Sequence, residues 1–295
     1  MKNLKPHLAI IATNVIFGIN ISVSRSLIPD KISPYTLSFF RMIGALVLFW
    51  LISLFLPKEK VSKKDIFLLL LAGFIGIFIN QMSFLVGLAS TSPVDASIIL
   101  TLLPVNSMIL AAIFLKEPIS AKKVIGVLIG ATGIVFLILN NSSDKLGSGN
   151  LYGNLLILCS SLSYAFYLTL FKRLVSRYSP VTVMKWMFLM ATICVLPVSW
   201  EFLQDCNLSS ISAFTISQIL FVVIFATFIT YILIPVGQKK LRPTLLSMYN
   251  YLQPLIAMAI AIYYGQSSFG WDKILAAILV FAGVYVVSIS RAKES

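Results

Sequence analysis

The residues of this chain that could do chemistry are polar side chains inside long apolar runs. Amides, hydroxyls and aromatic rings can hydrogen-bond, stack and make cation–π contacts without a strong net charge, which suits a zwitterion or a small amphipathic molecule. Because polar groups in a membrane helix usually face the bundle interior, we predict that they line one pocket. The predicted lining residues are Asn14, Asn20, Arg41, Asn80, Gln81, Ser97, Thr101, Tyr164, Tyr167, Trp186, Asn250 and Tyr251. For each residue alone, a hydrogen bond between helices is the alternative role.

Arg41 is the predicted lining residue that carries a full charge. It lies about eight residues into its apolar run, roughly 12 Å deep by helix rise. An arginine at a helix centre costs about 2.5–3.5 kcal/mol on insertion. Either its guanidinium faces the cavity, to bind a substrate carboxylate or close an outer gate with a partner such as Asp95, or it caps loop carbonyls or extends to the surface. No acidic residue lies in the middle of a run, so coupling to protons has no support.

Two stretches bounded by prolines, "PVDASIILTLLP" from Pro93 and "PTLLSMYNYLQP" from Pro243, start 150 residues apart. Pro93 and Pro243 lie in the first turn of their helices, where the backbone N–H that proline lacks would have no acceptor within the helix. Pro104 and Pro254 fall near mid-membrane, where each frees a carbonyl that needs a protein or water partner. We therefore predict helix kinks at Pro104 and Pro254 beside a hydrated pocket; the alternative is a kink packed by neighbouring helices.

The elements that position these residues are apolar runs of about 20 residues, each long enough to cross a bilayer as a helix. The chain is 59% hydrophobic and 11% charged, which indicates a membrane protein. The ten predicted helices lie at about 8–28, 34–56, 66–88, 93–115, 121–139, 151–171, 180–200, 214–237, 243–264 and 271–290.

The net charge of +13 follows the topology of the chain rather than a nucleic-acid surface. With both termini on one side, that side carries 17 Lys and Arg residues in its connections and the other carries three. By the positive-inside rule we expect both termini in the cytoplasm, an even number of crossings and a multi-pass protein of the cell membrane, of the bacterial inner-membrane type. The expected partners are the lipid bilayer and a small-molecule substrate, not nucleic acid.

At an offset of 150 residues, the helices of the first half match those of the second half beyond the two proline-bounded stretches as well. Each half therefore has five helices. Five is odd, and the second half therefore starts on the opposite side of the membrane from the first. We predict an all-α membrane protein of ten transmembrane helices in two inverted five-helix repeats, residues 1–140 and 150–290. Inverted repeats provide two near-equivalent packings around a site at their interface, as in a transporter that works by alternating access. The alternative is a larger bundle that serves as a channel, scaffold or receptor.

The stretch "GLASTSPVDASIILTLLPVNSMILAAIFLKEPISAKKVIGVLIGATGIVFL" resembles the end of an EamA-type repeat of the drug/metabolite transporter superfamily. The family's terminal Leu-Gly-Glu reads Leu-Lys-Glu here, with Lys116 in place of glycine and Glu117 retained. In the second half "YYGQSS" keeps Gly265 and has Ser267 where the family often has Glu. The resemblance covers nearly the whole chain and implies efflux of amino acids, other metabolites or toxic compounds. A nucleotide sugar or other organic anion is the alternative substrate, although it would favour more basic residues at depth.

A membrane-embedded enzyme is the remaining class, and the sequence argues against it. The single histidine, His7, lies at the chain start, and "GQSSFG" does not have the spacing of a serine-hydrolase elbow. Cys159, Cys194 and Cys206 show no metal or disulfide spacing. We expect no catalytic residue, no metal and no cofactor; the oligomeric state is left open.

Overall fold

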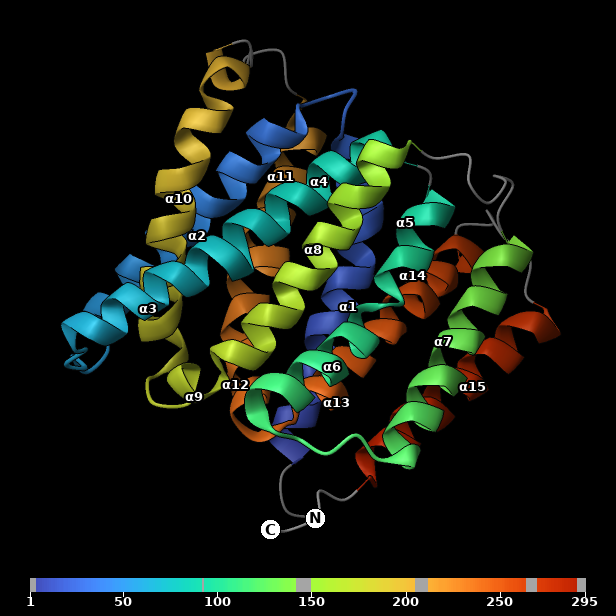
Figure 1. The fold of residues 1–295 in the computed structure, drawn as a ribbon. Coiled ribbons are helices and arrows are strands. Elements are labelled where there is room, and N and C mark those ends of the chain that lie inside the picture. Colours follow the sequence, from blue (N-terminus) through green and yellow to red (C-terminus); the bar gives the residue numbers. More distant parts are fainter. Residues whose placement is uncertain (1–3, 92, 142–149, 205–211, 264–269, 291–295) are drawn as a thin grey trace.

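The described residues of this computed structural model, 4–91, 93–141, 150–204, 212–263 and 270–290, form helices and connections with no strand (Figure 1). The motif residues Gly265 and Ser267, and Cys206, lie outside the described ranges. The first half contains α1 (Leu4–Leu27), α2 (Pro34–Leu54), α3 (Lys63–Gly73), the π-helical turn η1 (Phe74–Ile79), α4 (Asn80–Ser90), α5 (Pro93–Leu100), α6 (Leu103–Leu115) and α7 (Ala121–Asn141).

The second half repeats this order after the connection that ends at residue 150. It contains α8 (Leu151–Leu170), the short α9 (Lys172–Val175), α10 (Pro180–Gln204), α11 (Ala213–Val223), the π-helical turn η3 (Ile224–Ile229), α12 (Thr230–Lys240), α13 (Pro243–Met248), the 3-10 turn η4 (Tyr249–Tyr251), α14 (Leu252–Tyr263) and α15 (Trp271–Ser288).

These elements make ten crossings, and the prediction of an all-α membrane fold is confirmed. Within the described ranges, eight continuous or nearly continuous helices are long and apolar enough to span a bilayer. The other two crossings are the broken helix α13–η4–α14 and α15, whose residues Ile274–Ser288 are apolar. The crossings at 63–90 and 213–240 have 28 residues each, about 42 Å of helix, so they must tilt to fit a hydrocarbon core of about 30 Å.

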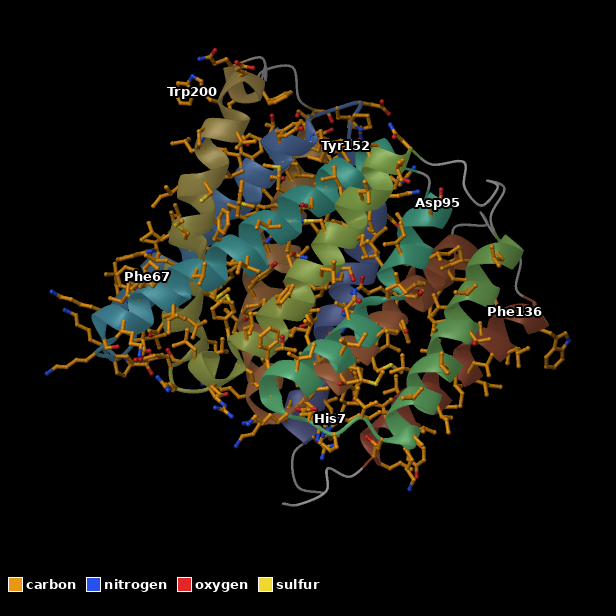
Figure 2. All side chains as sticks on the ribbon, viewed as in Figure 1. His7, Phe67, Asp95, Phe136, Tyr152 and Trp200 are labelled. Atoms are coloured by element: carbon orange, nitrogen blue, oxygen red, sulfur yellow. The ribbon has the colours of Figure 1, made fainter. Side chains whose placement is uncertain are left out.

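The two halves run in opposite directions. Helix α1 starts at the lower end of the bundle in Figure 1, near His7 in Figure 2, whereas α8 starts at the upper end, near Tyr152. Helices α2 and α10 are likewise antiparallel, as are α7 and α15. The π turns η1 and η3 begin 150 residues apart, at Phe74 and Ile224. The inverted arrangement of the repeats is therefore present in the helix directions and in a local distortion of the third crossing of each half.

Helix packing follows the same symmetry. Helix α1 packs against α12 and α14 of the other half, and α8 packs against α4 and α6. The pairs α2–α10 and α7–α15 each join equivalent helices. Close approach of α7 and α15 depends on glycine, because a Cβ atom on Gly283 would lie 2.6 Å from the Gly126 carbonyl oxygen. Gly126, Gly130 and Gly133 thus allow α7 to pack closely against its neighbours.

The inner prolines follow breaks in their helices rather than kinks within them. The fourth crossing is interrupted by a turn at Thr101 and Leu102, and Pro104 lies in the first turn of α6. The ninth crossing is interrupted by η4, and Pro254 lies in the first turn of α14. A proline in a first turn loses no helical hydrogen bond, so the break replaces the expected kink.

Candidate functional site

A cavity of about 190 Å³ lies between the two halves. Its wall comes from α1, α2, α4, α5, α6 and α7 of the first half and from α8, α12, η4 and α14 of the second. The predicted residues that line it are Asn20, Arg41, Asn80, Gln81, Ser97, Thr101, Tyr164, Asn250, Tyr251 and Pro254. The structure therefore brings most of the predicted set to one place at the repeat interface.

Three predicted pocket residues and one proline lie away from this wall. Asn14 is buried behind it, where its Nδ2 donates to the Ile10 carbonyl. Tyr167 is fully buried in the apolar core, and Trp186 packs edge-on against Trp50 with ring centroids 5.6 Å apart. Pro104 is buried and also does not line the cavity. Position within an apolar run predicts that such residues face the bundle interior, but it does not predict which inward side chains reach a void.

Arg41 is the charged residue of the cavity wall. Its side chain comes from α2 and is only 4% exposed. Its Nε donates to the Thr227 hydroxyl at 3.0 Å, and this hydroxyl donates in turn to the Val222 carbonyl at 2.8 Å. Thr227 lies within the π turn η3. Its hydroxyl therefore bonds to the carbonyl five residues earlier in the chain rather than four. No carboxylate of the described residues lies within 4.0 Å of the guanidinium.

Two hydrogen bonds join residues that are 150 positions apart. Gln81 Nε2 donates to the Tyr231 hydroxyl at 2.9 Å, and the Tyr251 hydroxyl donates to the Thr101 carbonyl at 2.8 Å. Thr101 is at the break before Pro104, so its carbonyl gains from the other half the partner that the broken helix does not supply. Contacts between equivalent positions of two repeats lie close to the pseudo-two-fold axis, which therefore passes beside the cavity.

Three functional candidates escaped the sequence analysis: Tyr231, Gln253 and Thr227. Tyr231 lines the cavity and is the counterpart of Gln81 at the 150-residue offset, so extending the repeat comparison to Gln81 would have found it. Gln253 also lines the cavity, and its Nε2 donates to Asn14 and to Asn250. Thr227 carries no sequence signal, because its position depends on the π turn.

Two polar atoms of the wall are buried without a hydrogen-bond partner. They are Gln81 Oε1, an acceptor, and Asn250 Nδ2, a donor. A buried polar atom without a partner costs about 1–3 kcal/mol, so an occupant of the cavity that bonds to it restores that free energy. The wall thus offers a cation at Arg41, a donor and an acceptor without partners, and aromatic rings, but no carboxylate among its described residues.

Polar contacts lie at the lower end of the bundle, and those of His7 and Ser179 join the two halves, whereas that of Lys172 lies within the second half. His7 Nδ1 and the Tyr249 hydroxyl are hydrogen-bonded at 2.7 Å, and Lys172 Nζ donates to the Leu241 carbonyl at 2.6 Å. Hydrogen bonds from Ser179 reach the Glu59 carboxylate at 2.9–3.0 Å. Although desolvation acts to raise it, bonds from Thr182 and Ser179 and the charge of Lys239 lower the pKa of Glu59 from its ordinary value.

Comparison with known proteins agrees with this architecture. The EamA-like transporter family matches residues 4–139 and again residues 151–289. The chain is 25% identical to the uncharacterized transporter YyaM of Bacillus subtilis over 98% of this chain and 95% of that protein. It is 28% identical to an uncharacterized transporter of Archaeoglobus fulgidus over 68% of this chain and 69% of that protein. One solved crystal structure superposes with a TM-score of 0.77 at 15% identity, over 95% of this chain and 98% of the other, and so shares the fold.

Proposed function

We propose that this chain, which belongs to the EamA-like transporter family, exports small zwitterionic metabolites that carry a carboxylate, such as amino acids, across the cell membrane. The observation that carries the proposal is Arg41, a buried cation in the wall of a cavity formed by both repeats. Among the described residues, no carboxylate forms an ion pair with it. A substrate carboxylate would supply the missing counter-charge through charge-assisted hydrogen bonds.

The other groups of the wall support a zwitterion. The open donor at Asn250 can add a second hydrogen bond to the carboxylate, and the open acceptor at Gln81 can take one from an ammonium group. Tyr164, Tyr231 and Tyr251 supply ring faces for the same ammonium or for an apolar side chain. At about 190 Å³ the cavity is smaller than the roughly 300–1,000 Å³ of pockets for drug-sized ligands, which favours a small metabolite over a nucleotide sugar.

Alternating access follows from the symmetry of the scaffold. Many residues of the wall, such as Asn20, Ser97 and Ala257, belong to the parts of their helices nearer the upper end, while hydrogen bonds join the halves at the lower end. Exchange of the two repeat conformations would close the upper end and open the lower one around the same site. The described residues of the wall include no carboxylate to carry a proton, so we propose flux down the substrate gradient, which points outward for metabolites concentrated in the cytoplasm.

The test is counterflow in vesicles that contain purified protein. Vesicles are loaded with one unlabelled amino acid at a time and diluted into a trace of the same labelled compound. A carrier accumulates label transiently and saturates with substrate, whereas a channel does neither. Flux without saturation or counterflow would favour the channel, and the absence of flux for every amino acid tested would remove the substrate assignment.

A further inference from the structure

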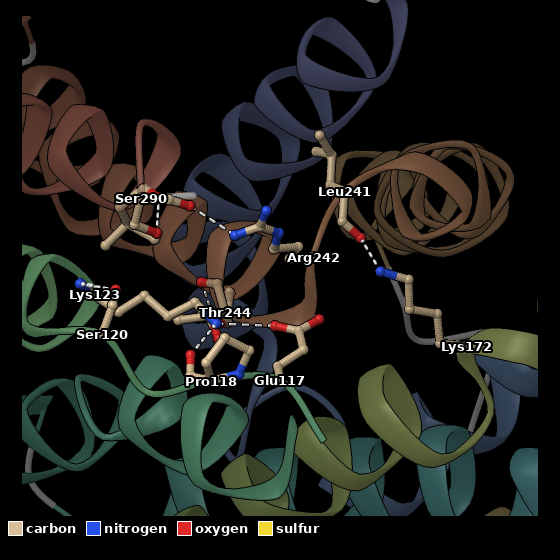
Figure 3. Close-up of polar contacts among 11 residues, drawn as sticks. Glu117, Pro118, Ser120, Lys123, Lys172, Leu241, Arg242, Thr244 and Ser290 are labelled. Atoms are coloured by element: carbon tan, nitrogen blue, oxygen red, sulfur yellow. Dashed lines mark hydrogen bonds and ion pairs between the residues drawn. The ribbon is translucent and has the colours of Figure 1, made fainter. Parts of the chain in front are cut away.

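A second cavity, of about 140 Å³, lies where α7 and α13 begin and α12 and α15 end, at the lower end of the bundle in Figure 1. Figure 3 shows the polar contacts of several residues at this place. Lys123 of α7 forms one side of it, and residues at the ends of α12, α13 and α15 form the rest. Its polar lining includes Lys123, Lys240, Arg242, Thr244, Ser288 and Ser290. Among the described residues, the wall contains three cations and no carboxylate, so an anion is the complementary ligand.

Two buried groups distinguish this cavity from a chance cluster of surface lysines. Lys123 is 2% exposed, and its Nζ donates to the Glu117 carboxylate at 3.1 Å and to the Pro118 carbonyl at 3.0 Å. Thr244 is fully buried, and its hydroxyl has no hydrogen-bond partner. A buried hydroxyl without a partner is unfavourable unless a ligand of the cavity bonds to it.

Arg242 supplies the donors best suited to such a ligand. One of its five N–H donors is used, because Nη1 bonds to the Ser290 carbonyl at 2.7 Å. Glu117 balances one of the three cations, so the cluster retains a net charge of about +2, counted from Lys123, Lys240 and Arg242. Guanidinium, ammonium and hydroxyl donors together match the several acceptor oxygens of a phosphate group better than the two of a carboxylate.

We propose that this cavity is a binding site for a phosphate group, supplied either by a phospholipid headgroup or by a free phosphate. Its place at the ends of the helices, on the side where the charge distribution puts the cytoplasm, suits a headgroup of the inner leaflet. Because Lys123 belongs to the first repeat and Arg242 and Thr244 to the second, a bound phosphate holds the repeats together at this end. The site is separate from the central cavity and does not depend on the substrate assigned there.

Native mass spectrometry of the purified full-length protein provides the test. The probes are phosphatidylglycerol, diacylglycerol of the same chain length, and inorganic phosphate at constant ionic strength with chloride as the reference anion. The test variants are Lys240→Gln combined with Arg242→Gln, and Lys240→Gln combined with Thr244→Val, which keeps the Arg242 bond to α15. The control is Lys63→Gln combined with Lys64→Gln, which removes two exposed charges near the start of α3, outside the cavity wall.

We expect phosphatidylglycerol to bind and diacylglycerol not to bind, with binding weakened about tenfold or more in both test variants and unchanged in the control. Binding of inorganic phosphate with the same sensitivity would identify a free phosphate as a sufficient ligand, whereas its absence would identify the lipid headgroup as the source. Equal loss in the control, or retention of diacylglycerol as strong as that of phosphatidylglycerol, would overturn the proposal. Unfolding temperatures measured without ligand identify a test variant that fails to fold. Binding to the other test variant then decides whether the proposal holds.

Discussion

Replacement of Arg41 by Gln is the most direct test of the central cavity. The substitution keeps an amide donor near Thr227 but removes the charge and the forked donor geometry. A hydrogen bond to a charged group contributes about 1.5–3 kcal/mol, which corresponds to a loss of about ten- to a hundredfold in affinity for a carboxylate. Thermal stability should be unchanged or higher, because the variant removes a buried cation that has no described carboxylate partner.

Arg41→Lys and Thr227→Val separate charge from geometry. Lysine retains the charge but not the fork, so it should recover little transport. Valine removes the hydroxyl that holds Arg41 Nε, and a loss of about 0.5–1.5 kcal/mol predicts roughly two- to tenfold weaker apparent affinity. Arg25→Gln is the matched control, because Arg25 is an exposed cation outside the cavity wall.

The informative assay compares an amino acid with its decarboxylated amine as competitors of vesicle uptake. Wild-type protein and Arg25→Gln should prefer the amino acid, and Arg41→Gln should lose that preference even where some transport survives. If Arg41→Gln discriminates between the two compounds as the wild type does, the guanidinium does not bind the carboxylate, and Arg41 has a structural role.

Two further predictions concern movement and pH. In a background without native cysteines, a thiol cross-link between Gln81→Cys and Tyr231→Cys should leave transport near that of the same variant without the cross-link. A cross-link between His7→Cys and Tyr249→Cys should abolish transport. Equal inhibition by both cross-links would contradict the proposed motion. The pKa of Glu59 is below its ordinary value of 4.5, so its contribution to stability is complete above that value and is lost as the pH falls further. The unfolding temperature should therefore drop more between pH 7 and pH 4 in the wild type than in Glu59→Gln, and equal drops would show that this carboxylate does not link the halves.

The crossings and the repeat were predictable from sequence because they depend on local properties. A bilayer requires long apolar helices, and an odd helix count per repeat leaves inversion as the consistent topology. The prolines marked the fourth and ninth crossings correctly, but sequence could not distinguish a kink from a break. That choice depends on whether a partner exists for the Thr101 carbonyl, and Tyr251 in the other half provides it.

The π turns and the cavity wall were less accessible to sequence reasoning. The segments "FIGIFI" and "IFATFI" read as ordinary apolar helix, yet both are wider turns in the structure. A Cβ atom on Gly73 would lie 2.2 Å from the Met187 carbonyl oxygen, so the approach of α10 to this crossing is a tertiary feature. Polarity within an apolar run puts Trp186 in the predicted pocket, whereas the structure packs it against Trp50 and places Tyr231 in the wall instead. Both outcomes depend on how helices from different halves meet.

Symmetry also determines which contacts can survive the exchange of conformations. If the halves swap their conformations, a contact between residues i and j is replaced by the contact between their counterparts, 150 positions away in each case. The residue pairs Gln81–Tyr231 and Thr101–Tyr251 map onto themselves, so each pair can stay in contact in both states. The bond between His7 and Tyr249 joins the halves and has no such relation, so we expect it to break when the lower end opens. Bonds between equivalent residues are therefore suited to act as a pivot beside the cavity, and bonds between inequivalent residues at the helix ends are suited to act as a gate.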